Sequence, residues 1–207
     1  MATQNAIVKS RAKSSGPRDK VYEIAAEVFH NKGYDKTSMS DIASAVGLTK
    51  AGLYHHVASK EQLLYTILDY GMDMTEAYVV RPLDSVKDPV VRLKTMIELH
   101  LKLILEGRKL AVTGLLHECQ GLSPKSENRI NRRKKEYVQL VSDLVGDVLD
   151  KTKSHKDVNP KVAALALLGM LNWTYQWYKP SGEVKPDEVV REFQDLFING
   201  VLGTGEC

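Results

Sequence analysis

The sequence predicts an all-α fold. Apolar residues recur at spacings of three and four along most of the 207 residues, and capping residues, glycine or proline bound each such stretch. No stretch alternates apolar and polar residues as a half-buried strand requires. Apolar residues make up 43% and charged residues 27% of the chain, the balance of a globular protein with a packed core.

The first predicted helix follows a polar, basic tail over residues 1–17, which we expect to be disordered. Its apolar residues share one helical face: Val21, Ile24, Ala25, Val28 and Phe29. Gly33 is placed to end it. Residues 1–60 carry nine lysines and arginines against five acidic residues. This excess favours an anionic partner, and a solvated basic surface is the alternative.

Two short helices follow, separated by a turn of a few residues. The first opens at Ser38, which forms a capping-box pattern with Asp41, and ends at Gly47. The second covers residues 50–56. This arrangement is typical of a helix-turn-helix unit, although an αα-hairpin with a solvated polar face has the same spacing.

The second short helix should turn Leu53 and Val57 inward and its polar residues outward. Gly52 lacks side-chain bulk where a backbone could approach a phosphate closely. The outward side chains that can donate hydrogen bonds include Lys50, Tyr54, His55 and the nearby Lys60. In a helix-turn-helix protein, phosphate contacts set the register, and the N-terminal part of the second helix reads base edges in the major groove.

Longer helices continue the pattern. Ser59 and Gln62 form a capping box for a helix over about residues 60–80, which Pro82 should close. Further starts with proline at the first position lie at Pro89, Pro124, Pro160 and Pro186, and a short helix is expected near residues 110–119.

The helix over residues 162–178 is apolar nearly all round, so it should be buried on several sides. Together with the last helix it could form a four-helix interface between two copies, a homodimer through residues 158–202 with contacts such as Leu167 and Phe193. The alternative is that both helices complete the core of a monomer.

Several function classes find no support. The apolar run over residues 162–171 is shorter than the roughly 20 residues of a membrane span, and the N-terminus lacks the apolar segment of a signal peptide. Two cysteines, Cys119 and Cys207, do not make a disulfide framework, which suits a cytoplasmic protein. No phosphate loop, nucleophile elbow, dinucleotide motif or zinc-ligand spacing occurs, so we expect no enzyme, metal or cofactor. The rival functions are a helical enzyme or ligand carrier and a protein-interaction module.

The N-terminal part of the chain resembles the DNA-binding domain of the tetracycline-repressor (TetR) family. The shared segments are AAEVF at 25–29, GY at 33–34, TSM at 37–39, IA at 42–43, AVGLTK at 45–50, GLYHHV at 52–57 and SKEQLL at 59–64. Val57 departs from the phenylalanine of many members. The resemblance implies a dimeric, ligand-responsive transcription factor, usually a repressor, with a domain for double-stranded operator DNA over 18–64 and a ligand-binding and dimerisation domain over 65–207.

The resemblance also implies roles for single residues. Ser38, Tyr54 and Lys60 would hold phosphates. Ser40, Thr49, Lys50, Ala51 and His55 lie where the family reads bases or the adjoining backbone, and Gly52 lies among them.

The C-terminal part resembles, at residues 116–137 and 172–178, the branch that regulates fatty-acid and steroid catabolism, whose effectors are often acyl-coenzyme A (acyl-CoA) thioesters. The candidate effector-binding residues are Met72, His100, Leu103, Leu116, His117, Tyr137, Trp173 and Trp177. Aromatic and histidine residues at helical spacing also occur simply as core residues. The basic run over residues 129–135 is interpreted as a solvated helix face, with contact to a coenzyme A phosphate as the alternative.

Overall fold

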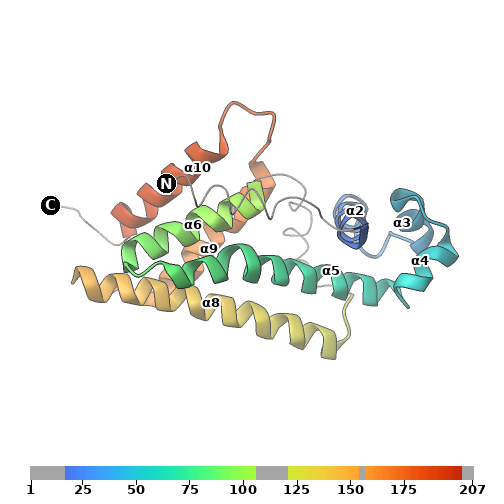
Figure 1. The fold of residues 1–207 in the computed structure, drawn as a ribbon, viewed down its shortest axis with the longest axis horizontal. Coiled ribbons are helices and arrows are strands. Elements are labelled where there is room, and N and C mark those ends of the chain that lie inside the picture. The colour runs from blue at the N-terminus through green and yellow to red at the C-terminus, as the bar shows by residue number, and fades with distance from the viewer. Residues whose placement is uncertain (1–16, 106–120, 154–156, 202–207) are drawn as a thin grey trace.

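The computed structural model describes residues 17–105, 121–153 and 157–201 (Figure 1). Every regular element in these residues is helical, which confirms the predicted all-α fold. The predicted basic tail before residue 17, the predicted helix near residues 110–119, and the candidate pocket residues Leu116 and His117 lie outside the described residues. No helix in the described ranges combines the length and the hydropathy that crossing a membrane requires.

The helices follow the predicted order. Their bounds are α2 Pro17–Lys32, α3 Met39–Val46, α4 Lys50–His56, α5 Lys60–Thr75, the π-helical turn η1 Glu76–Val80, the 3₁₀ turn η2 Arg81–Ser85, α6 Pro89–Leu105, α8 Pro124–Thr152, α9 Pro160–Trp177, α10 Pro186–Asp195 and the π-helical turn η3 Leu196–Val201.

Helices α2, α3 and α4, with the first half of α5, form a small domain that we call the head. Its core contains the apolar residues of all four helices, with Phe29, Ile42, Leu53 and Leu64 fully buried. The residues predicted to cap and to end the helices of the head are found at the ends of these helices. Gly33 and Gly47 adopt the left-handed conformation at the ends of α2 and α3, with φ of 82° and 72°.

Helix α5 leaves the head and runs beside α8 into the rest of the molecule (Figure 1). The helical path continues to residue 80, as predicted, but its last turn is π-helical. Pro82 does not close the path, because a 3₁₀ turn carries it on to Ser85. Pro82 is the second residue of η2, where the path changes from π-helical to 3₁₀ geometry.

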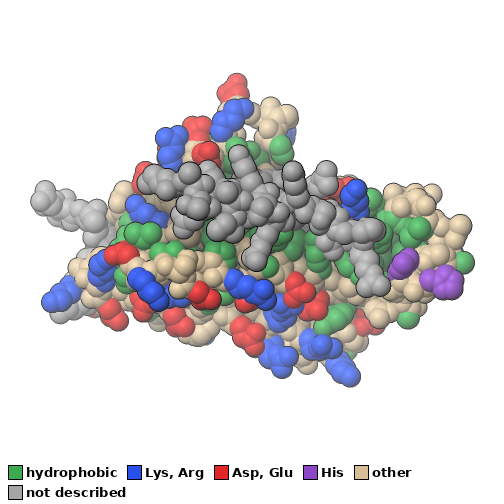
Figure 2. Space-filling model, viewed as in Figure 1, with side chains coloured by type: hydrophobic (Ala, Val, Ile, Leu, Met, Phe, Trp, Pro, Cys, Tyr) green, Lys and Arg blue, Asp and Glu red, His purple; other side chains and the backbone are tan. Residues whose placement is uncertain are grey.

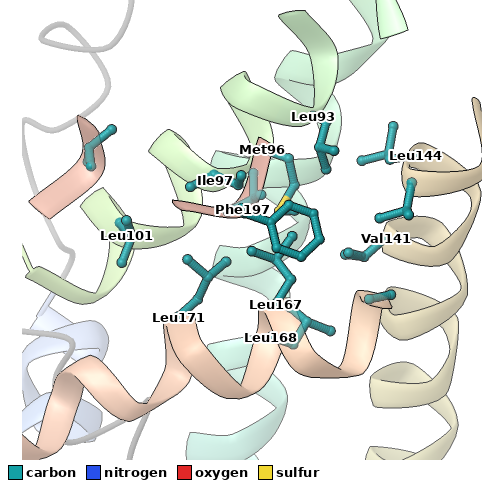
Figure 3. Close-up of a cluster of buried hydrophobic side chains, with 14 of the residues drawn as sticks. Leu93, Met96, Ile97, Leu101, Val141, Leu144, Leu167, Leu168, Leu171 and Phe197 are labelled. Carbon is teal, nitrogen blue, oxygen red and sulfur yellow. The ribbon is translucent and has the colours of Figure 1, made fainter. Parts of the chain in front are cut away.

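The other helices, α6, α8, α9 and α10, form the body. Their shared core surrounds Phe197, whose ring lies among Met96, Val141 and Leu167 (Figure 3). Leu167 is fully buried inside its own chain, so the expectation that it contacts a second subunit was wrong. The apolar pattern of α9 could not distinguish its core-facing side from its outer side.

Head and body share apolar contacts. Ile130 comes from α8 of the body but is fully buried in the head core. Leu103 of α6 packs against both cores. At the surface, the hydroxyl of Tyr34 donates a hydrogen bond to the carbonyl oxygen of Gly121 at 3.3 Å. These contacts fix the position of the head relative to the body.

Candidate nucleic-acid interface and ligand pocket

Helix α4 is anchored on one side and open on the other. Leu53 is its buried residue, and Val57, buried as predicted, ends it. The hydroxyl of Thr49 caps the helix by accepting the N–H of Gly52 at 3.0 Å. The side chains of the expected reading face are exposed: Ser40, Thr49, Lys50, Ala51, Tyr54 and His55. Histidine side chains gather at this end of the molecule (Figure 2).

The structure gives a reason for glycine at position 52 that the sequence did not indicate. A Cβ atom at this position would lie 3.1 Å from the Oγ1 atom of Thr49, tighter than an ordinary contact. A larger residue would therefore disturb the N-terminal cap of α4 as well as any close approach of the backbone to a phosphate.

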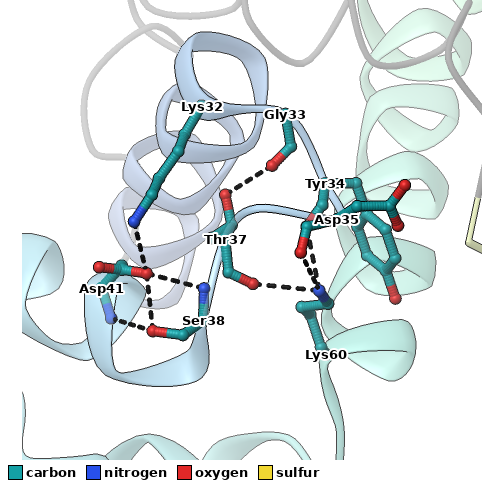
Figure 4. A network of polar contacts seen from close by, with 8 residues as sticks. All are labelled: Lys32, Gly33, Tyr34, Asp35, Thr37, Ser38, Asp41 and Lys60. Atoms are coloured by element: carbon teal, nitrogen blue, oxygen red, sulfur yellow. Dashed lines mark hydrogen bonds and ion pairs between the residues drawn. The ribbon is translucent and has the colours of Figure 1, made fainter.

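Ser38 and Asp41 form the predicted capping box at the start of α3 (Figure 4). The Ser38 hydroxyl accepts the N–H of Asp41 at 3.2 Å, and Asp41 Oδ2 accepts the N–H of Ser38 at 2.8 Å. Lys32 pairs with the same carboxylate at 2.8 Å. These bonds, led by that from Lys32, hold the pKa of Asp41 well below its usual value. Ser38 is exposed, but its hydroxyl already serves the cap.

The side chain of Lys60 binds the turn before α3. Its Nζ atom donates to the carbonyl oxygens of Tyr34 and Thr37, each at 3.0 Å, and to that of Asp35 at 3.5 Å (Figure 4). The ammonium also lies 4.3 Å from the centroid of the Tyr34 ring. Because an ammonium has three N–H donors, these bonds occupy Lys60 in fixing the turn before α3, and its phosphate contact stays a prediction.

A cavity of about 360 Å³ lies between α5, α6, α8 and α9. Four of the predicted effector-binding residues line it: Met72, His100, Leu103 and Tyr137. The other lining residues were not among the predictions: Gly71, Met74, Thr75, Ile104, Lys134, Val138, Leu165, Leu168, Gly169 and Asn172.

Trp173 and Trp177 do not line the cavity. They are 62% and 43% exposed on the outer side of α9. The helix turns about 100° per residue, so the face that carries Leu168 and Asn172 toward the cavity carries Trp173 away from it. Asn172 lies four residues after Leu168, and this spacing is the signal that could have found it.

The polar groups of the cavity are bonded to one another. His100 Nδ1 lies 2.8 Å from the hydroxyl of Tyr137, and His100 Nε2 lies 3.0 Å from Oδ1 of Asn172. The Tyr137 and His100 rings stack with their centroids 5.8 Å apart. Burial raises the pKa of Tyr137. Thr75 adds a hydroxyl, which donates to the carbonyl oxygen of Gly71 at 3.0 Å.

The basic run over residues 129–135 divides into different roles. Arg133 clamps α8 to α5, with its guanidinium 2.7 Å from Asp69 Oδ1 and 2.8 Å from Asp73 Oδ1. Lys134 lines the cavity. Arg132 and Lys135 are exposed. Neither sequence interpretation therefore describes the whole run.

The outer side of α9 carries an exposed apolar stripe. Val162, Leu165, Trp173 and Trp177 recur along one face, with the small residues Ala166 and Gly169 between them. Leu165 and Gly169 lie at the edge of this stripe, because they also line the cavity. Leu196 of η3 is also exposed. Within the described ranges, no group of three His, Cys, Asp or Glu side chains is arranged to hold a metal ion.

Comparison with known families identifies both halves of the chain. Residues 21–66 match the profile of bacterial regulatory proteins of the tetR family. Residues 86–201, more than half of the chain, match the tetracyclin repressor-like C-terminal domain. The chain belongs to the TetR family. As a TetR-family member, it is a DNA-binding transcriptional regulator, and the second match covers the body helices from α6 to η3.

Two solved structures match this chain over most of its length. The structure of AibR in complex with isovaleryl coenzyme A and operator DNA is 34% identical, covers 87% of this chain and 97% of its own, and has a TM-score of 0.79. The TetR-family regulator PfmR from Thermus thermophilus is 29% identical, covers 90% and 99%, and has a TM-score of 0.75. The transcriptional repressor KstR2 of Mycolicibacterium smegmatis is 24% identical over 185 residues, or 89% of this chain and 90% of its own.

Proposed function

We propose that this chain is a homodimeric cytoplasmic repressor that leaves its operator when a short acyl-CoA thioester enters the body. The main support for this proposal is the cavity of about 360 Å³. One of its walls is formed by α5, and the same helix begins in the head. The similarity to AibR, whose solved complex contains isovaleryl coenzyme A and operator DNA, supports the ligand class. No catalytic activity is part of the proposal.

Operator binding would use the open side of α4. Lys50, Ala51 and His55 would face bases or the adjoining backbone together with Ser40 and Thr49, and Tyr54 and Ser38 would contact phosphates. The exposure of these residues supports this role. Lys60 would act indirectly, because it fixes the turn that positions α3.

Dimerisation would bury the apolar stripe of α9. An exposed row of valine, leucine and tryptophan side chains is unfavourable in water, and a two-fold axis would pair it with the same row of a second copy. Two α4 helices held about one DNA turn apart could then enter successive major grooves.

The cavity volume favours a short acyl group. Pockets for whole drug-sized ligands span about 300 to 1,000 Å³, and this cavity lies at the lower end of that range. The acyl chain would occupy it among Met72, Leu103 and Leu168. The larger coenzyme A moiety would extend outside, with Lys134 as the lining cation that could meet its phosphates.

Release would act through α5 and α8. Gly71, Met72 and Thr75 of α5 line the cavity, while the same helix begins in the head at Lys60. An effector that separates α5 from α8 would tilt the head and change the spacing of the two α4 helices. Its preference for the released state needs to be only a few kcal/mol to change operator occupancy.

The test is a fluorescence-anisotropy titration with DNA from upstream of the gene. Straight and branched acyl-CoA thioesters of increasing length are added, with free coenzyme A and free fatty acids as controls. Each buried methylene should add about 0.8 kcal/mol until the cavity is full, after which release should weaken. If no thioester releases the DNA at tens of micromolar, the effector class is wrong. A carrier without operator function would instead show no salt-dependent DNA binding.

A further inference from the structure

Three side chains from three helices form a hydrogen-bonded row along the cavity. Tyr137 comes from α8, His100 from α6 and Asn172 from α9, and all three line the cavity wall. The hydroxyl of Tyr137 lies 2.8 Å from His100 Nδ1, and His100 Nε2 lies 3.0 Å from Asn172 Oδ1. The row therefore connects the body helices through polar contacts within a largely apolar wall.

The amide oxygen of Asn172 determines which atom donates the proton in its hydrogen bond with His100. An amide oxygen only accepts hydrogen bonds, so His100 Nε2 must carry the proton that it shares with Asn172. His100 Nδ1 shares the second hydrogen bond of the row with the Tyr137 hydroxyl, and this hydroxyl also lies 3.7 Å from Sδ of Met96. Burial favours the protonated hydroxyl, because it raises the pKa of Tyr137.

Asn172 lines the cavity, and its bond to His100 uses only its amide oxygen. With its oxygen held by His100, the carboxamide plane of Asn172 is fixed, and its Nδ2 atom bears two N–H groups. Nδ2 makes no hydrogen bond to any residue in the described part of the chain. A donor enclosed by an apolar ligand without an acceptor would lose its hydrogen bonds to water, which is unfavourable.

We propose that Asn172 determines the specificity of the effector site by donating a hydrogen bond from Nδ2 to the carbonyl oxygen of a thioester. This inference rests on the proposed acyl-CoA function and adds to it a named contact. His100 and Tyr137 are positioning residues, since they act on the ligand only through the orientation of Asn172. Leu103 and Leu168 surround the acyl chain without distinguishing a carbonyl from a methylene.

The experiment compares two ligands that differ at one carbon. Isovaleryl-CoA carries a carbonyl next to sulfur, and its thioether, S-(3-methylbutyl)-coenzyme A, carries a methylene there. The affinities are measured by isothermal titration calorimetry of the full chain without DNA. The wild-type protein should bind the thioester about tenfold more tightly than the thioether. The Asn172→Leu variant should bind both ligands with nearly equal affinity.

A second variant keeps the test independent of packing at this position. Asn172→Asp has nearly the same shape and can still accept from His100, but it has no N–H to donate. It should also lose the preference for the thioester, and cooperative thermal unfolding checks that each variant is folded. Tyr137→Phe should reduce the preference, because it releases His100. Thr95→Val is the matched control, because Thr95 of α6 is not among the residues that line the cavity and its hydroxyl donates to the carbonyl oxygen of Val91 at 2.8 Å, so the ratio should remain as in the wild type.

The outcomes separate the two proposals. If wild-type protein binds thioester and thioether equally, or if both Asn172 variants retain the wild-type ratio, the role of Asn172 is wrong while the acyl-CoA function stands. If neither ligand binds the wild type, the effector class fails, and the inference fails with it.

Discussion

Glu61 Oε1 accepts a hydrogen bond from the backbone N–H of Ser123 at 2.9 Å, so the first turn of α5 caps the start of α8. In a capping box within one helix, a glutamate at the third position makes this bond. Here Ser126 holds that position, and its hydroxyl lies 3.4 Å from the same Glu61 oxygen. A residue of the head therefore completes the N-terminus of a body helix.

Removal of this cap should weaken the protein in a pH-dependent way. The Ser123 and Ser126 contacts lower the pKa of Glu61 from its usual 4.5, with the side-chain bond to Ser123 the largest cause. A lowered folded-state pKa gives stability above pH 4.5 that is lost as the pH falls through the folded pKa. The difference in unfolding free energy between wild type and Glu61→Ala, measured by urea unfolding, should thus shrink as the pH falls below 4.5. Glu183→Ala, in the α9–α10 connection, is the control, and a pH-independent difference would contradict the cap.

The Arg133 clamp should contribute both to stability and to signalling. Arg133→Met removes the ion pairs with Asp69 and Asp73 and should lower the unfolding free energy by about 1 kcal/mol. It should also lower the isovaleryl-CoA concentration at which half of the operator is released, because these ion pairs hold together the two helices that the effector is proposed to separate. Arg132→Met is the matched control. Its side chain is 73% exposed and lies 4.0 Å from Glu136, so it should change stability by less than about 0.5 kcal/mol.

Two lysines of the head should affect DNA binding differently. Lys50→Met should weaken operator binding and reduce the slope of log affinity against log salt by about one, since an exposed charge that meets a phosphate releases a counterion. Lys60→Met should weaken binding with the slope unchanged, because its ammonium binds carbonyl oxygens of the chain. Fluorescence anisotropy at several salt concentrations measures both. A slope reduced by one in Lys60→Met would restore the phosphate role for Lys60.

The apolar stripe of α9 should hold the dimer. Trp173→Arg inserts two charges into the paired interface and should yield monomer in sedimentation velocity at micromolar concentration. Val91→Arg is the control, because Val91 is 52% exposed on α6, away from the stripe, and the dimer should persist. A dimeric Trp173→Arg protein would show that another surface pairs the subunits.

The head was predictable because its signals are local. The capping box of Ser38 with Asp41, the glycine at 47 and the apolar spacing around Leu53 each act within a few residues. The bonds of Lys60 within the chain could not be predicted, because its partners are carbonyl groups 23 to 26 residues earlier and no pattern in the sequence records backbone positions across that distance.

The pocket was predicted only in part, for a reason that lies in α9. A helix that is apolar nearly all round gives no signal for which side is inner, so the two tryptophans were expected in the cavity although they lie outside it. Asn172 was overlooked as a pocket residue since the aromatic residues Trp173 and Trp177 follow it in the sequence, and only the packing of α9 against α6 brings it to His100.

The shared contacts of Ile130 and Leu103 also bear on how the molecule unfolds. Loss of the body would remove Ile130 from the head core, so residues 17–66 alone should not hold the fold seen here. Heating should then melt the two parts together, with a calorimetric enthalpy equal to the van't Hoff enthalpy when the protein concentration excludes dissociation. A regulator built in this way has no independently folded reading head that proteolysis could release to occupy the operator without control.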